Sequence, residues 1–150
     1  MATLHKTPIS VLVVIHTPDL QVLLMERADH PGYWQSVTGS QHPGETLRET
    51  AIREVVEETG LDAKQFVLTD WRQQNVYEIY SEWRHRYAPG VTHNTEHVFG
   101  LTVPTSLPVK LTDREHLRYA WHPHQEAAQR CFSPSNAQAI LMLGERFPPQ

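Results

Sequence analysis

Apolar residues gather in several short runs along the chain, separated by turn-forming residues. Residues 9–15 and 21–25 are rich in Val, Ile and Leu, and the Thr-Pro-Asp triplet at 17–19 between them has the chemistry of a turn. We predict that these two runs form a β-hairpin. Residues 29–40 follow with Pro, Gly and Ser, which favours a loop that carries Trp34.

Further runs predict strands in the middle of the chain and a helix near its end. Residues 66–87 include two or three strand-like stretches rich in Val, Ile, Tyr and Trp, and residues 96–103 and 117–121 are shorter strand candidates. A helix is predicted over residues 134–144, because its first residue is a proline and Ser133 stands before it as N-cap.

The clearest helix signal covers residues 46–59. Thr46 and Glu49 form a capping box, and apolar residues recur at four-residue spacing until Gly60, which is typical of a helix end. Strands and helices mix without strict alternation. We therefore predict one α/β domain of the α+β kind over residues 1–150, with a mixed sheet between helices.

Composition places the chain among ordinary globular domains. Of its 150 residues, 39% are hydrophobic and 20% charged, and 13 Lys and Arg against 17 Asp and Glu give a net charge of −4. That balance argues against a nucleic-acid partner or an anionic membrane, since both favour a basic excess. The single cysteine, Cys131, excludes an internal disulfide, and the longest apolar run has only five residues. We expect a cytoplasmic protein with no nucleic-acid or membrane partner, and composition leaves its oligomeric state open.

Three glutamates share one face of the helix predicted at residues 46–59. Glu54, Glu57 and Glu58 project within about a third of the helix circumference. Like charges at this spacing cost roughly 0.2–0.5 kcal/mol per pair, so the cluster weakens the helix unless something compensates it. Either these residues form a solvated acidic face, or they hold a hard divalent cation such as Mg²⁺ or Mn²⁺, which prefers oxygen ligands.

The residues around this cluster form a longer spaced pattern that resembles the Nudix box, with every defined position present. Seven of its positions, all but the apolar Val55 and Leu61, require one fixed residue type. Seven such identities match by chance with a frequency on the order of 10⁻⁹ per start position, so the resemblance is specific. The matching positions are Gly39, Glu45, Arg53, Glu54, Val55, Glu57, Glu58, Gly60 and Leu61.

This resemblance implies both a fold and a chemistry. The fold is a Nudix-type α/β/α sandwich whose loop–helix–loop carries the site, and the chemistry is hydrolysis of a nucleoside diphosphate linked to another group. The three helix glutamates are then ligands of Mg²⁺, with Mn²⁺ as a substitute, and one of them is the general base. Arg53 is then a catalytic residue that orients carboxylates through Glu45, unless it is a surface partner of a glutamate one helical turn away. Gly39 and Gly60 are implied to need backbone conformations that favour glycine.

A fourth carboxylate outside the box often completes metal sites in this family. Glu115, just before the strand predicted at residues 117–121, is the candidate, and a plain loop acid is the alternative. Diphosphate cleavage requires neutralised phosphate oxygens, a positioned water and a group that takes its proton. Clustered carboxylates with bound cations supply all three.

Segments outside the box extend the resemblance to one branch of the family. Residues 34–40 depart from the commoner pattern of a proline and two glycines, and together with residues 84–92 and 94–96 they look like the dihydroneopterin triphosphate pyrophosphatase branch. That branch removes pyrophosphate from dihydroneopterin triphosphate in folate biosynthesis and leaves the monophosphate. The alternatives are a general nucleoside triphosphate pyrophosphohydrolase that accepts dATP and, from another class, a Nudix module that senses a nucleotide without cleaving it.

The branch resemblance also implies contacts to the phosphates of a small-molecule triphosphate. Lys6 and Arg27 lie at predicted strand ends, where each is a candidate phosphate contact or simply an exposed cation. Thr38 is a candidate donor to the same phosphates or a turn hydroxyl. Ser133 can cap its helix and touch the ligand, and capping alone is the alternative.

The candidate contacts to the substrate's ring are Tyr77, Glu78 and Tyr80. The two tyrosines offer aromatic walls, and the carboxylate can accept from the amino edge of a pterin. Because successive strand residues face opposite ways, only part of this segment can line one pocket unless the strand bulges. A strand of the core is the alternative.

Overall fold

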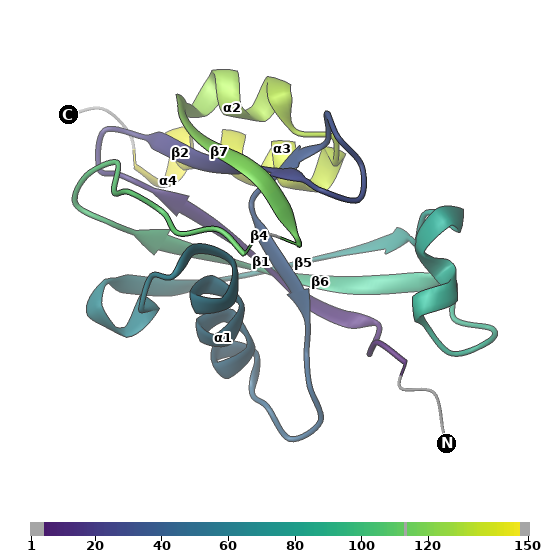
Figure 1. Ribbon diagram of the computed structural model, residues 1–150. Coiled ribbons are helices and arrows are strands. Elements are labelled where there is room, and N and C mark those ends of the chain that lie inside the picture. Colours follow the sequence, from purple (N-terminus) through teal and green to yellow (C-terminus); the bar gives the residue numbers. More distant parts are fainter. Residues whose placement is uncertain (1–4, 113, 148–150) are drawn as a thin grey trace.

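A central sheet with helices on both faces forms the architecture of the protein (Figure 1). The computed structural model describes residues 5–112 and 114–147. Its elements are β1 (Ile9–His16), β2 (Gln21–Arg27), β3 (Trp34–Gln35), β4 (Val37–Ser40), α1 (Leu47–Thr59), the 3-10 helix η1 (Ala63–Gln65), β5 (Val67–Glu78), the 3-10 helix η2 (Ser81–Arg86), β6 (His93–Thr102), β7 (His116–Pro123), α2 (His124–Arg130), α3 (Pro134–Leu141) and α4 (Leu143–Arg146).

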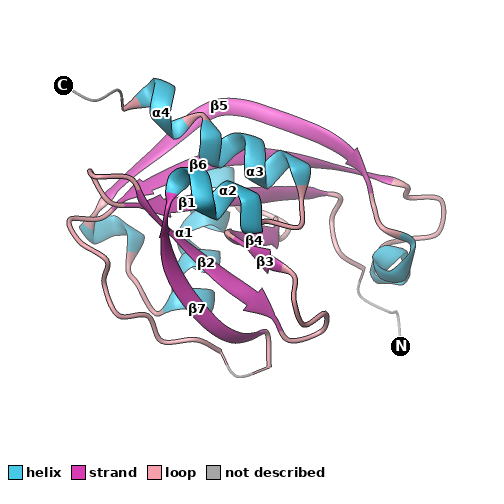
Figure 2. Cartoon of the chain, turned by 90° about the horizontal axis from the view of Figure 1, so that it is seen from above, coloured by secondary structure: helices cyan, strands magenta, loops and turns pink. Residues whose placement is uncertain are grey.

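Strand β1 lies inside the sheet and has different neighbours along its two edges. On one edge it pairs in parallel with β6, which pairs antiparallel with β5. On the other edge it pairs antiparallel with β4 and, at one position, with β2, which continues the sheet to β3 and β7. Helix α1 covers one face, and α2 and α3 cover the other (Figure 1 and Figure 2). The predicted mixed sheet and α/β/α sandwich are confirmed.

Burial on both faces explains the continuous apolar run of β1. Val11 and Val13 pack in the core on the α1 side, where they join Val55. Leu12 points the other way and joins Ile140 of α3. A strand covered by helices on both sides has no solvent face, so its sequence does not alternate between polar and apolar residues.

Helix α1 begins and ends where the sequence predicts. The hydroxyl of Thr46 accepts from the Glu49 amide at 3.1 Å, and the Glu49 carboxylate accepts from the Thr46 amide at 3.0 Å, so the capping box is complete. Gly60 follows the helix with φ 74°, a left-handed conformation that glycine adopts without strain.

The hairpin predicted from the first two apolar runs is confirmed only beside its turn. β1 and β2 are strands, but their register holds a single pair, His16 with Val22, beside the turn. The remaining edges are taken by segments that follow later in the chain, so residues 34–35 and 37–40, predicted as loop, are strands β3 and β4. Such pairing depends on partners distant in sequence, which local composition does not reveal.

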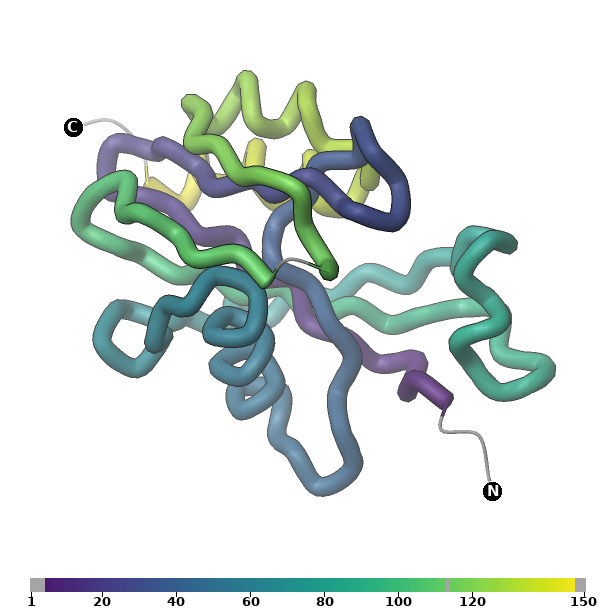
Figure 3. The backbone as a smooth tube through the Cα atoms, in the orientation of Figure 1, coloured from purple at the N-terminus to yellow at the C-terminus, as the bar shows by residue number. Residues whose placement is uncertain are grey.

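The segment 66–87 also divides differently from the prediction. It forms one twelve-residue strand, β5, whose register shifts between Asp70 and Gln73, where Arg72 has φ 56°. Residues 81–86 are not a strand but the helix η2. In Figure 3, β5 and β6 run out together from the rest of the sheet, with η2 near their far end.

The C-terminal helix begins at Pro134 as predicted but is interrupted before Gly144, so that α3 and α4 are separate. Ser133 precedes it, yet the Ser133 hydroxyl lies 3.1 Å from that of Ser135 and makes no bond to a helix amide, so the predicted side-chain cap is wrong. The seven-residue helix α2 was not predicted. Within the described residues, no helix is long and apolar enough to cross a membrane.

Candidate active site

One cavity of about 1240 Å³ collects all of the site residues predicted from the sequence. It extends from α1 and β4 to the far ends of β5 and β6, η2 and the start of α3. We define its carboxylate end by Glu54, Glu57, Glu58 and Glu115. We define its aromatic end by Tyr77, Tyr80, Trp83 and Phe132. The other predicted residues that line the cavity are Lys6, Arg27, Thr38, Arg53, Glu78 and Ser133.

Glycine at position 39 makes room for the carboxylate end. A Cβ atom built on Gly39, in strand β4, would overlap the carboxyl group of Glu54. Gly39 is not among the residues with positive φ, so the expectation of a special glycine conformation is wrong at this position. Its role is spatial: only glycine lets helix α1 bring Glu54 against the strand.

Glu58 is the most deeply buried acid of the carboxylate end. It is 2% exposed, and neither of its carboxylate oxygens has a hydrogen-bond partner among the described residues. Burial, together with the neighbouring charge of Glu54, raises the pKa of Glu58 well above its usual range, and burial also raises the pKa of Glu54. Two such groups need a proton or a cation to offset their desolvation and repulsion.

Arg53 connects the acids of α1 to the loop before it. Its guanidinium lies 2.7 Å from Glu45, 2.7 Å from Glu54 and 3.3 Å from Glu57. It also donates to the carbonyl of Ser40 at 2.9 Å. The hydrogen bond from Arg53 lowers the pKa of Glu45 to about 2. The structure thus brings Arg53 together with Glu45, as the resemblance implies, and with an acid one turn away, as the alternative reading implies.

The remaining acids lie at the cavity wall without forming a finished metal site. Glu57 is half-exposed and paired with Arg53, while Glu115 is exposed and its charge also raises the pKa of Glu58. Within the part of the chain that the structure describes, no three His, Cys, Asp or Glu side chains stand in a ready metal-ligating arrangement. The acids lie along one cavity wall, but Arg53 already pairs with Glu54 and Glu57.

Sequence reasoning missed His116, which stands beside the most buried acid. Its Nε2 lies 3.7 Å from a carboxylate oxygen of Glu58, and burial lowers the pKa of His116 to about 4. The imidazole is therefore neutral at neutral pH. His116 directly follows Glu115 and is the first residue of β7. A polar residue at a buried position of a strand was the signal that the sequence offered.

The residues predicted to contact phosphate differ in how far they already pair with other residues of the protein. Arg27 is held by Asp29 at 2.7 Å and lies 4.4 Å above the ring of Trp83. Arg86, which the sequence did not single out, also reaches Asp29, at 3.2 Å. The hydroxyl of Thr38 donates to a β1 carbonyl at 3.1 Å, which agrees with its structural alternative. Lys6 is exposed at the cavity wall.

The aromatic end has more rings than the sequence indicated. Tyr80 stacks on Trp83 with 5.4 Å between ring centroids, and the edge of Phe132 meets both of them at about 6 Å. The hydroxyl of Tyr77 accepts from the side chain of Asn94 at 3.0 Å. Trp83 lies on η2 and Phe132 between α2 and α3, so their approach to the strand depends on tertiary structure.

Two further polar residues of the aromatic end were not assigned a role from the sequence. Asn94 and Glu96 lie on one face of β6 and are 1% and 4% exposed. By contrast Glu78, the acid predicted to meet the ring, is exposed and paired with Arg84. Polar residues at the buried positions of a strand were the available signal, since the interior rarely keeps such groups without a partner.

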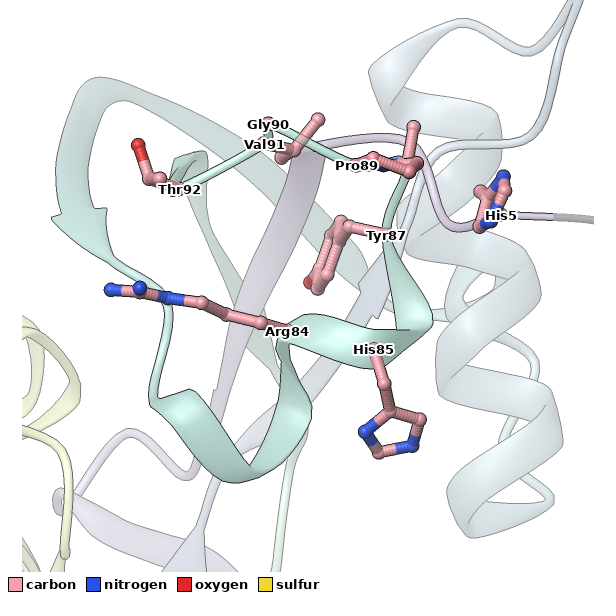
Figure 4. A pocket seen from close by; sticks show the side chains of 9 residues that line it. His5, Arg84, His85, Tyr87, Pro89, Gly90, Val91 and Thr92 are labelled. Atoms are coloured by element: carbon pink, nitrogen blue, oxygen red, sulfur yellow. The ribbon is translucent and has the colours of Figure 1, made fainter.

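A smaller hollow of about 490 Å³ adjoins the larger cavity and shares His5 and Tyr87 with it (Figure 4). It is lined by His5, Arg84, His85 and residues 87–92, with the ring of Tyr87 facing it. Among these described residues there is no carboxylate and none of the predicted site residues. The larger cavity is therefore the candidate active site.

Comparisons with known proteins identify the family of the chain. The NUDIX domain pattern matches residues 6–143. The dihydroneopterin triphosphate diphosphatase of Escherichia coli (strain K12) is 48% identical over 139 residues, which cover 91% of each chain. The protein of that name from Haemophilus influenzae is 40% identical over 139 residues, or 91% of this chain and 87% of the other. The solved structure of the E. coli dihydroneopterin triphosphate pyrophosphohydrolase matches with a TM-score of 0.89 and 45% identity, over 96% of this chain and 99% of that one.

Proposed function

The chain belongs to the NUDIX family, and from this membership we propose that it hydrolyses dihydroneopterin triphosphate to dihydroneopterin monophosphate and pyrophosphate. Residues 1–150 form one such domain, which acts in the cytoplasm on a small-molecule triphosphate in folate biosynthesis. The observation that carries the proposal is the 48% identity to a dihydroneopterin triphosphate diphosphatase over 91% of both chains. The complete set of box acids supports the hydrolytic part of it.

The carboxylate end fits a divalent cation, which Nudix hydrolases generally need. The fit rests on Glu58, whose two buried oxygens have no partner among the described residues, and on Glu54 beside it. We assign Mg²⁺, with Mn²⁺ as a substitute, to Glu54, Glu57, Glu58 and Glu115, because hard cations prefer oxygen ligands. When bound, the cation neutralises phosphate oxygens and lowers the pKa of water.

The chain's own residues then divide the remaining work. Arg53 holds Glu54 and Glu57 in place, and one of the helix glutamates takes the proton of the attacking water. Lys6 and Arg27 bring positive charge toward the triphosphate at the cavity wall.

At the aromatic end, Tyr77 and Tyr80 offer ring faces to the flat pterin. Thr38 and Ser133 lie along the cavity wall between strand and helix. We propose weaker contacts to the ligand for these two residues than for Lys6 and Arg27. The Thr38 hydroxyl already donates to a carbonyl of β1, and the Ser133 hydroxyl is already hydrogen-bonded to that of Ser135.

The nearest alternative is a general nucleoside triphosphate pyrophosphohydrolase, for example one acting on dATP. Product analysis separates the two functions: dihydroneopterin triphosphate, dATP and other triphosphates are incubated with the protein, with and without Mg²⁺, and the products are separated. We expect pyrophosphate and the monophosphate, only with the cation, and a higher kcat/KM for the pterin. A higher value for dATP would favour the alternative, and binding without cleavage would favour the sensing module.

A further inference from the structure

The sheet face beneath α3 changes from apolar to polar toward the aromatic end. Leu12 of β1 and Val98 of β6 pack in the core of this face. The next residues on the same face of each strand are Ser10 on β1, and Glu96 and then Asn94 on β6. All three are at most 4% exposed. Burying polar groups costs free energy unless they find partners, so the partners of this patch are informative.

Glu96 keeps half of its carboxylate free. One oxygen, Oε1, accepts from the Ser135 hydroxyl at 3.0 Å and from the Asn75 side chain at 3.4 Å. The other oxygen accepts no hydrogen bond from the described residues, although the side chain lines the cavity. Burial raises the pKa of Glu96. A carboxylate in this position is completed by N–H donors that a ligand brings.

Flat rings line the same end of the cavity as that carboxylate. Tyr77 lies close enough for the charge of Glu96 to raise the pKa of its hydroxyl, although burial is the larger cause, and Asn94 fixes the hydroxyl of Tyr77. The stacked pair of Tyr80 and Trp83 lines the same end of the cavity. The site thus combines aromatic faces with a buried acceptor that carries charge when ionised, which suits a planar ring with N–H groups on one edge.

We propose that Glu96 reads the edge of the substrate's ring, by accepting from the 2-amino group and the adjacent ring N–H of a 2-amino-4-oxo ring. This inference rests on the proposed function and names the residue that gives it selectivity. The free oxygen of Glu96 can accept from one of these N–H donors, and Oε1, which Asn75 reaches only at 3.4 Å, can accept from the other. Pterin and guanine share this edge. Adenine presents a ring lone pair beside its amino group, and hypoxanthine has the ring N–H without the amino group.

The position of Glu96 is compatible with cleavage at the carboxylate end. Ser40, Ser10 and Glu96 are direct neighbours across β4, β1 and β6. Two strand spacings separate Glu96 from Ser40 by about 10 Å, which a side chain and triphosphate can span. Gly39, next to Ser40, contacts the Glu54 carboxylate. Glu96 and the acids of α1 line the same cavity, so a ring held at Glu96 leaves its phosphates within reach of α1.

Glu96 takes the place of Glu78, the acid that the sequence predicts to meet the ring. Glu78 is on β5 near the same end, but its side chain is 66% exposed and paired with Arg84. An exposed, paired carboxylate gives little discrimination, because water competes for every donor the ligand offers. Glu96 has the burial and the free oxygen that discrimination requires.

The test is kcat/KM for dihydroneopterin triphosphate, dGTP, dITP and dATP on wild type, Glu96→Gln and the control Glu82→Gln. Gln keeps an oxygen for Ser135 and Asn75 but presents an amide to the ligand. We expect wild type to prefer dGTP to dITP by about tenfold or more, and Glu96→Gln to bring that ratio within about threefold. Dihydroneopterin triphosphate should lose about tenfold or more while dATP does not fall. Glu82, exposed on η2, should leave every ratio unchanged.

An unchanged dGTP to dITP ratio in Glu96→Gln, or an equal loss on all four substrates, would overturn the inference in favour of a structural role. If the variant does not fold, equal wild-type values for dGTP and dITP overturn it without any variant. The proposed function fails separately, if wild type cleaves dihydroneopterin triphosphate no better than dATP. A wild type that prefers the pterin, with its ring preference intact in Glu96→Gln, would leave the proposed function standing and remove only Glu96.

Discussion

The two ends of the cavity are assembled from the chain in different ways. The carboxylate end is dominated by one segment, between Gly39 and Gly60, in which a helix repeat brings the acids together. The aromatic end is drawn from β5, η2, β6 and the segment between α2 and α3. The class of reaction is therefore encoded locally and can be recognised in a sequence, whereas the choice of ring depends on distant segments that only the fold brings together.

The largest expected effect separates chemistry from stability at the carboxylate end. Glu58→Gln should lower kcat by about 100-fold or more, equivalent to about 2.7 kcal/mol, because a ligand of the cation is lost. Without metal, the same change should raise the melting temperature by about 3 °C, because glutamine carries no charge where burial and Glu54 disfavour one. Steady-state kinetics and thermal unfolding measure the two effects.

The control for that variant is Glu49→Gln on the same helix. Glu49 is exposed, and glutamine preserves the capping box, so activity and stability should both stay near wild type. Wild-type activity in a folded Glu58→Gln protein would remove Glu58 from the proposed cation site.

A second variant tests the space that the carboxylate end requires. Gly39→Ala places a methyl group where the Glu54 carboxyl group lies, so kcat should fall by about thirtyfold and stability by about 1–3 kcal/mol. In a Glu54→Ala background the same substitution should cost little stability, because the overlap is gone. Equal costs in both backgrounds, from urea unfolding, would contradict the spatial role of Gly39.

Glu115 tests whether the carboxylate end extends beyond its own segment. Glu115→Ala should lower kcat by about tenfold, or about 1.4 kcal/mol, and raise the Mg²⁺ concentration needed for half-maximal rate. Titration of the rate with Mg²⁺ gives both values. A change of less than about twofold would identify Glu115 as an ordinary loop acid.

The smallest expected effect concerns the region between the two ends. Lys6→Ala should reduce kcat/KM by about fivefold, or about 1 kcal/mol, for dihydroneopterin triphosphate and dATP alike, because both carry the same phosphates. If only the pterin substrate were affected, Lys6 would belong to ring selection rather than to phosphate binding.

The limits of the sequence follow the same division. The helix, its caps and the acids of α1 are set by contacts within a few turns, so their pattern predicts them. The pairing of β4 with β1 and the approach of Trp83 and Phe132 arise from contacts between distant segments. In the sequence Glu78 and Glu96 are both glutamates in strand-like runs, and burial, which only the fold supplies, distinguishes them.

The ratio of kcat/KM for dihydroneopterin triphosphate to that for dATP, measured with Mg²⁺, tests the division between the two ends most directly. In Glu58→Gln both values should fall together and the ratio should stay within about twofold of wild type. In Tyr80→Ala the ratio should fall by about fivefold or more, because only ring contacts are lost. A changed ratio in Glu58→Gln together with an unchanged ratio in Tyr80→Ala would contradict the account.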